Sequence, residues 1–295
     1  MIYYDGTKIP QQKLIDYLCT IETQLGDLSR AKVPSRRFKL PLTFESKRQT
    51  DAIKRYMETQ RPYASYLPDN IDFVARNNAF TRAELENIYL TASFMVTTVG
   101  FFTALPIALP VDPRQRMNCP KMNPSRVFTP AGQVSWGGSC LAIYTVDSPG
   151  GYQMNGMTIP GVDILGTKRG YAPEKPWLFE DFDQITFYQV TEEEYERQLA
   201  LFQSGRYEYE WEVVEFDMAE HNRLLKETKE EVKAIRARQR KAQAEMDLLE
   251  KELLERWAKE KAERGVSMDT VEELLKGLSS ILCSILLQRV FCTNM

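Results

Sequence analysis

Apolar residues recur along the first third of the 295-residue chain with spacings that predict both helices and strands. Between Leu14 and Leu25 the spacing is helical, so we expect one short amphipathic docking or linker helix. From Arg37 to Phe44 apolar and polar residues alternate, which predicts a strand, and Pro41 restricts that strand to a sheet edge or a bulge. A second helix is expected over residues 47–60.

A further helix is predicted to begin at Thr81, because Thr81 and Glu84 have the spacing of a capping box. Its apolar positions are expected to continue to Met95. Before it, residues Pro68–Phe73 are expected to form a turn that leads into a short strand. The polar residues of this turn either form the turn itself or face a ligand.

The pattern changes near residues 100–108, where short strands separated by Gly and Pro replace the helices. Regular short strands of this kind predict a β-barrel or a sandwich-like unit that ends near Val190. The whole chain is therefore expected to be an α+β protein. The predicted strands span residues 107–110, 133–136, 140–146, 153–159 and 184–190.

Beyond residue 190 the pattern predicts a capped helix over Thr191–Ser204 and then a strand near residues 207–213 with one apolar and one acidic face. A long, highly charged helix is expected from Asp217 to about Glu263, as a solvated spacer or docking helix. The apolar run in residues 281–287 is far shorter than a membrane-spanning helix, so no membrane role is expected.

Composition excludes several classes of function. The net charge of −3, with basic residues spread along the chain, argues against nucleic-acid binding. The five cysteines lie far apart without metal-type spacing, which favours reduced thiols, and no secretory signal is recognised, so a cytoplasmic protein is expected. His221 is the single histidine, which excludes Ser-His-Asp catalysis and argues against histidine-ligated metals.

The candidate site comes from three polar turns between Asn123 and Gly156. Glycine pairs let backbone N–H groups approach a ligand, and proline fixes the angle of approach, so such turns suit small polar or anionic groups. Ordinary hairpin turns explain the pattern equally well. The turns are Asn123-Pro124-Ser125-Arg126, Gly137-Gly138-Ser139 and Ser148-Pro149-Gly150-Gly151-Tyr152-Gln153.

These turns, with several other segments in matching order, resemble the C-and-D subdomain of biotin-dependent carboxyltransferases, also called the allophanate hydrolase subunit 1 family. The likeness is strongest to the fungal urea carboxylase type and runs from about residue 3 to about residue 260. The other matching segments are Pro68–Phe73, Leu109–Arg114, Phe128–Pro130, Ser135–Gly138, Lys175–Leu178 and Phe182–Ile185.

The resemblance implies a small α/β subdomain followed by a cyclophilin-like β-barrel. It also implies carboxyl transfer from carboxybiotin to urea, which forms allophanate. Carboxybiotin would come from a carrier domain outside this chain, and ATP would be used by a separate biotin carboxylase domain. The implied partners are these two domains and the A-and-B half of the carboxyltransferase. The alternative is a non-catalytic binding or regulatory protein of the kinase-inhibitor or 5-oxoprolinase-subunit type.

The resemblance assigns roles to polar groups that can position urea and stabilise negative charge. Asn70, Asp112 and Arg114 are expected to be catalytic. The substrate-binding candidates are Asp69, Asn123, Arg126, Gly137, Gly138, Gly150, Gly151, Tyr152 and Gln153.

Structural alternatives stand beside these roles. Asp112 and Arg114 can form an ion pair around Pro113, Arg126 can brace its turn, and Tyr152 can lie half in the core.

The expected division of the chain follows the same resemblance: a linker helix (1–33), subdomain C (34–104), subdomain D (105–216), a charged helical linker (217–264) and a divergent or truncated tail (265–295). That tail has no Met-Lys-Met biotin site, and the chain has no Gly-rich P-loop.

Overall fold

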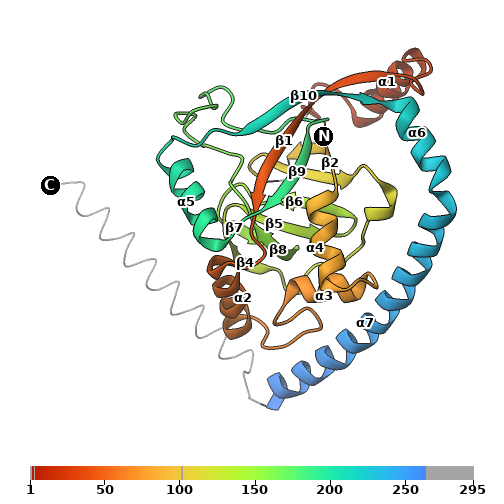
Figure 1. Cartoon of the computed structure of the whole chain (residues 1–295). Coiled ribbons are helices and arrows are strands. Elements are labelled where there is room, and N and C mark those ends of the chain that lie inside the picture. Colours follow the sequence, from red (N-terminus) through yellow and green to blue (C-terminus); the bar gives the residue numbers. More distant parts are fainter. Residues whose placement is uncertain (1, 3, 101, 264–295) are drawn as a thin grey trace. The chain divides into compact units, whose positions relative to one another are not determined.

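The computed structural model describes residues 2, 4–100 and 102–263, so the expected tail lies outside the described residues. The chain divides into two units, residues 1–247 and residues 248–295. In the second unit, residues 248–263 are helical. The elements (Figure 1) are α1 (Gln11–Gln24), β1 (Lys32–Leu42), α2 (Lys47–Thr59), α3 (Asn70–Asn77), α4 (Arg82–Thr91), β2 (Phe94–Gly100), β3 (Leu105–Pro110), the 3-10 helix η1 (Pro113–Gln115), β4 (Arg126–Thr129), β5 (Gln133–Gly137), β6 (Cys140–Ile143), β7 (Ser148–Gly150), β8 (Gln153–Met157), β9 (Gln184–Gln189), α5 (Glu192–Gln203), β10 (Glu210–Asp217), α6 (Met218–Glu227) and α7 (Lys229–Glu263).

The first unit is a mixed α and β structure around one large, curled sheet. Eight strands run in the order β10-β1-β9-β2-β3-β6-β5-β8, and β4 and β7 form a separate pair. Thr43, directly after β1, exchanges two backbone hydrogen bonds of 3.1 and 2.9 Å with Met157 at the end of β8. Because β1 and β8 lie near opposite ends of the strand order, this bridge requires the sheet to curl back on itself (Figure 1).

Strand β1 supplies the middle of the core. Phe38, Leu40 and Leu42 alternate along it and are fully buried, as the sequence pattern predicts. Pairing with β10 ends at Lys39, whereas pairing with β9 continues to Leu42. Pro41 therefore lies where β1 has a neighbour on one side only, so its missing N–H is tolerated as expected for an edge.

The helices between β1 and β2 begin at polar caps. Ser46 caps α2 through the backbone N–H of Arg48, and Thr81 and Glu84 form the predicted capping box at the start of α4. The end of α4 was predicted wrongly, because the helix stops at Thr91 and Met95 lies in strand β2. Helix α4 packs on α3 and on β9, so these helices cover the sheet (Figure 1).

The predicted turn and strand over Pro68–Phe73 is wrong, because the chain enters helix α3 there. One carboxylate oxygen of Asp69 accepts hydrogen bonds from the N–H groups of Ile71 (2.8 Å) and Asp72 (3.0 Å). These are donors that a helix leaves unpaired at its start, so Asp69 stabilises a helix rather than a strand. Phe73 then packs in the core with its side chain 1% exposed.

The C-terminal elements agree largely with expectation. Helix α5 follows Thr191, whose hydroxyl accepts from the N–H of Glu194. Asp217 caps α6, and the long charged helix is divided at Thr228 into α6 and α7. No residue of helix α1 is buried, so its apolar positions make no core.

Candidate functional site

The Asn123 turn is held in place by its backbone. The N–H of Asn123 donates to the Tyr66 hydroxyl (3.1 Å), and the Asn123 carbonyl accepts from that hydroxyl (2.9 Å) and from Arg61 (3.0 Å). The Asn123–Pro124 peptide bond is cis. The Asn123 side chain is exposed, so it is available to a ligand while its backbone is fixed.

Arg126 ties this turn to the glycine turn that precedes β8. Its side chain is 1% exposed, and its guanidinium donates to the Tyr152 carbonyl at 2.6 Å. The N–H of Met122 donates to the Gly151 carbonyl at 2.6 Å, which joins the same two turns. Burial lowers the pKa of Arg126 to about 10. Arg126 therefore braces the two turns from inside the protein.

The glycines permit close packing of two tyrosine rings. A Cβ on Gly137 would lie 2.3 Å from the Tyr152 ring, and a Cβ on Gly150 would lie 2.1 Å from the Tyr144 hydroxyl. The N–H of Gly138 donates to the Cys119 carbonyl at 2.7 Å. The N–H of Gly138 is thus engaged by the chain, and Gly137 and Gly150 make room for aromatic side chains.

A pocket of about 250 Å³ opens beside these turns. Tyr152 is half buried, as the structural alternative for it expects, and its ring lies 5.2 Å from the Lys121 ammonium. Burial raises the pKa of Tyr152, so the phenol stays a neutral hydrogen-bonding group. The lining residues are Leu105, Ile107, Lys121, Ser125, Ala142, Tyr144, Pro149, Gly150, Gly151 and Tyr152.

Three polar residues of this pocket were not among the sequence candidates: Lys121, Ser125 and Tyr144. Ser125 belongs to the Asn-Pro turn, so its place within that motif was an available signal. Lys121 lies two residues before Asn123, whereas nothing local in the sequence marks Tyr144. An ammonium, a hydroxyl and two phenols around a partly apolar cavity can hold a small planar molecule with a carboxylate or carbonyl.

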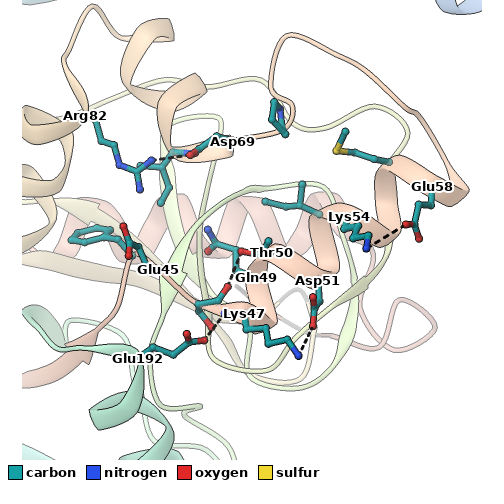
Figure 2. Close-up of a pocket in the computed structure, with 16 residues that line it drawn as sticks. Glu45, Lys47, Gln49, Thr50, Asp51, Lys54, Glu58, Asp69, Arg82 and Glu192 are labelled. Carbon is teal, nitrogen blue, oxygen red and sulfur yellow. Dashed lines mark hydrogen bonds and ion pairs between the residues drawn. The ribbon is translucent and has the colours of Figure 1, made fainter.

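Asp69 lines a different and larger pocket of about 1000 Å³ between α2 and the start of α3 (Figure 2). There its carboxylate pairs with Arg82 at 2.8 Å, and Figure 2 shows the two side chains pointing toward each other. Lys54 and Glu58 form another pair on the same wall at 4.0 Å. The acidic and basic side chains of this pocket thus partly neutralise one another.

Asn70 and Gln153 are fully buried and bind backbone groups. The Asn70 amide donates to the Tyr66 carbonyl (2.7 Å) and accepts from the N–H of Met154 in β8 (3.0 Å). The Gln153 amide donates to the Pro120 carbonyl (2.9 Å), and its buried oxygen has no hydrogen-bond partner among the described residues. Asn70 therefore fixes the start of α3 to β8, and Gln153 fixes the segment before the Asn123 turn.

Asp112 and Arg114 form the expected ion pair, with 2.6 Å between carboxylate and guanidinium. Burial alone would raise the pKa of Asp112, but the hydrogen bonds from Arg114 lower it below its usual value. Arg114 also lies 3.4 Å from Glu231 in α7. Neither residue lines the pocket of Tyr152 or that of Asp69. The structure thus brings the glycine turns, Arg126 and Tyr152 together and places Asp69 and the Asp112–Arg114 pair elsewhere.

Metal ligation and membrane insertion find no support in the described part of the chain. No group of three or more His, Cys, Asp or Glu side chains there is arranged to hold a metal ion. None of the helices in that part combines the length and apolar composition required to traverse a membrane.

The fold and these turns agree with a known family. The profile of the carboxyltransferase domain, subdomains C and D, matches residues 1–165, which is more than half of the chain. The chain therefore belongs to the family of carboxyltransferase C-and-D subdomains.

Similar proteins are longer enzymes. Over 276 residues the chain is 99% identical to a protein of Emericella nidulans whose name assigns it to the urea carboxylases, covering 94% of this chain and 22% of that protein. It is 41% identical to the urea amidolyase of Lachancea kluyveri, covering 80% of this chain and 13% of that protein. The crystal structure of the K. lactis urea amidolyase superposes with a TM-score of 0.75 at 37% identity, over 83% of this chain and 15% of that one. The chain thus spans about a fifth or less of the length of these relatives.

Proposed function

We propose that this chain is the C-and-D part of the carboxyltransferase of a cytoplasmic, biotin-dependent urea carboxylase. In that enzyme it would bind urea and assist transfer of a carboxyl group to it, which forms allophanate. The observation that carries the proposal is the 41% identity to a urea amidolyase over 80% of the chain. A more distant relative, a 5-oxoprolinase component from Bacillus subtilis, is 24% identical over 48% of the chain, which supports the non-catalytic alternative less strongly.

The proposal includes the division of labour within the longer protein. Biotin carried by a separate domain would deliver the carboxyl group, and ATP would be used by a biotin carboxylase domain. The A-and-B half would complete the carboxyltransferase. We also propose that the curled sheet is the cyclophilin-like barrel of this family, with subdomain C at residues 34–104 and subdomain D at residues 105–216.

The pocket beside Tyr152 fits a carboxylated ureido group by its chemistry. Carboxybiotin, when bound, supplies the carboxyl group for transfer. The Lys121 ammonium and the Ser125 hydroxyl line this pocket and can donate to a carboxylate. The Tyr144 and Tyr152 rings provide apolar walls that exclude water and strengthen these interactions.

The predicted site residues then divide by exposure. We propose that Asp69, Asn123, Gly150, Gly151 and Tyr152 contact substrate or lie at the rim of its site, since each lines a pocket or is exposed. The others position them or complete the site when the remaining domains assemble: Asn70, Asp112, Arg114, Arg126, Gly137, Gly138 and Gln153.

Reconstitution tests this proposal. The purified chain, added to a urea carboxylase from which the C-and-D part has been deleted, should restore urea-dependent fixation of labelled bicarbonate into allophanate. Lys121→Met should reduce the restored rate by at least about tenfold, because it removes a charged donor from the pocket. Lys241→Met, on the exposed surface of α7, is the matched control and should restore fully.

Circular dichroism of each variant must first show an intact fold. A folded chain that binds the truncated enzyme and restores no turnover would contradict the catalytic proposal and favour a non-catalytic binding protein. Equal activity of Lys121→Met and Lys241→Met would instead remove the Tyr152 pocket from the reaction.

A further inference from the structure

A second concave site, far from neutral in charge, lies where α6 and α7 meet the segment after η1. Its volume is about 350 Å³. Five of its eight lining residues are cationic, and no lining residue within the described part of the chain is acidic. The lining residues are Pro113, Arg116, Leu225, Lys229, Val232, Lys233, Arg236 and Arg240.

Most of these cations have no carboxylate to neutralise them. In the described part of the chain, no Asp or Glu oxygen lies within 4.0 Å of the charged groups of Arg116, Lys229, Arg236 or Arg240. Lys233 alone is paired, with Glu230 at 3.8 Å on the exposed surface. The nearest acidic groups in η1 and α7 are already used, because Asp112 and Glu231 both pair with Arg114.

The helical repeat of α7 concentrates the charge on one face. Lys229, Lys233, Arg236 and Arg240 follow one another at intervals of four, three and four residues, so they lie on the same side of the helix. Like charges at this spacing repel each other. Burial, and after it repulsion from Arg236, lower the pKa of Arg116, which places these two guanidinium groups near each other. An anion would relieve this repulsion.

The pocket is fixed before any ligand arrives. Gln239 of α7 is buried, and its amide donates to the Arg116 carbonyl at 3.0 Å. The Arg116 Nε donates to the Pro110 carbonyl at 3.2 Å, which leaves its two terminal nitrogens for another acceptor. Val232 packs with its side chain 8% exposed and anchors this face of α7. A preorganised cationic pocket loses less conformational freedom on binding.

We propose that this pocket binds a small molecule that carries two or more phosphate groups. Guanidinium groups match phosphate oxygens in geometry and keep their charge, and several adjacent cations favour a multiply charged anion over a single carboxylate. The volume suits a compact ligand better than an extended acidic peptide, which needs a longer groove. Leu225 and Val232 offer an apolar surface to the remainder of such a molecule.

Calorimetric titration of the full chain with inorganic pyrophosphate at about 50 mM salt tests the proposal, which is independent of the carboxyltransferase reaction. Pyrophosphate should bind with submillimolar affinity, and binding should weaken as salt increases. The double variant Arg236→Gln/Arg240→Gln should weaken it at least about tenfold, which corresponds to one lost charge-assisted interaction. The matched double variant Arg238→Gln/Lys241→Gln, on α7 outside the pocket lining, should change it less than about twofold.

Thermal melting without ligand checks that both double variants fold, and the pocket variant should melt no lower than the wild type because it loses repulsion. Three results would overturn the proposal. One is the absence of heat and of a melting shift with pyrophosphate at millimolar concentration. Another is equal weakening by both double variants, which would indicate diffuse attraction to the basic surface. The third is tighter binding of an oligoglutamate peptide than of pyrophosphate, which would assign the surface to a protein partner.

Discussion

Gly150 shows how a single absent side chain shapes the candidate site. A Cβ at this position would lie 2.1 Å from the Tyr144 hydroxyl and 2.5 Å from its ring, and Tyr144 is itself 5% exposed. The ring cannot move away without disturbing the core, so Gly150→Ala should lower the free energy of unfolding by about 1–3 kcal/mol. Urea denaturation measures this. Gly6→Ala, where the nearest atom is 3.9 Å away, is the control and should have little effect.

Two asparagines predicted for the same site should separate in their behaviour. Asn70→Ala leaves the buried Tyr66 carbonyl and the Met154 N–H without their partner, so we expect a loss of about 2 kcal/mol or more. Asn123→Ala removes an exposed amide and should leave stability unchanged. Denaturation curves of the two variants measure the difference. Equal stability would show that the Asn70 hydrogen bonds contribute nothing to the fold.

At the scale of elements, local chemistry in the sequence indicated helix starts better than helix ends. Thr81 and Glu84 form a capping box that is visible as a spacing of three residues. Asp69 carries the same kind of signal, but the proline before it favoured a turn, and the helix it caps was missed. Met95 fits a helical period as well as a strand, and only pairing with β3 decides between them. Short apolar runs are therefore assigned by their tertiary partners.

The start of α5 should make stability depend on pH. Hydrogen bonds from Arg197 and Gln198 lower the pKa of Glu194 to about 2, below its ordinary value of 4.5. The folded chain thus holds the carboxylate charged where the unfolded chain takes up a proton. This contribution is present above about pH 4.5 and is lost as the pH falls from there toward 2. Glu194→Gln should flatten the dependence of unfolding free energy on pH in that window, whereas Glu245→Gln should retain it. An unchanged slope in Glu194→Gln would contradict this assignment.

At the scale of the whole molecule, the site depends on contacts that no local pattern encodes. The glycine turns were recognised because glycine and proline mark backbone geometry within a few residues. The pocket, however, needs Tyr144 and Leu105 from other strands, and their positions follow from the order of strands in the sheet. Asp69 was expected beside the turns, yet it lines another pocket because it caps α3 over the groove next to α2. Family resemblance supplied the fold class, but it placed no side chain.

The order of strands also predicts which truncation the first unit will tolerate. β10 covers the outer edge of β1 over eight residue pairs, and the Trp211 ring lies 6.2 Å from the buried ring of Phe38. A chain that ends at residue 209 would expose this edge and part of the core, so we expect its melting temperature to fall by at least about 5 °C, with aggregation. A chain that ends at residue 247 retains the whole first unit and should melt within about 2 °C of the full chain. Differential scanning calorimetry of both chains decides the matter, because equal melting of the shorter chain would mean that β10 is not needed to complete the sheet.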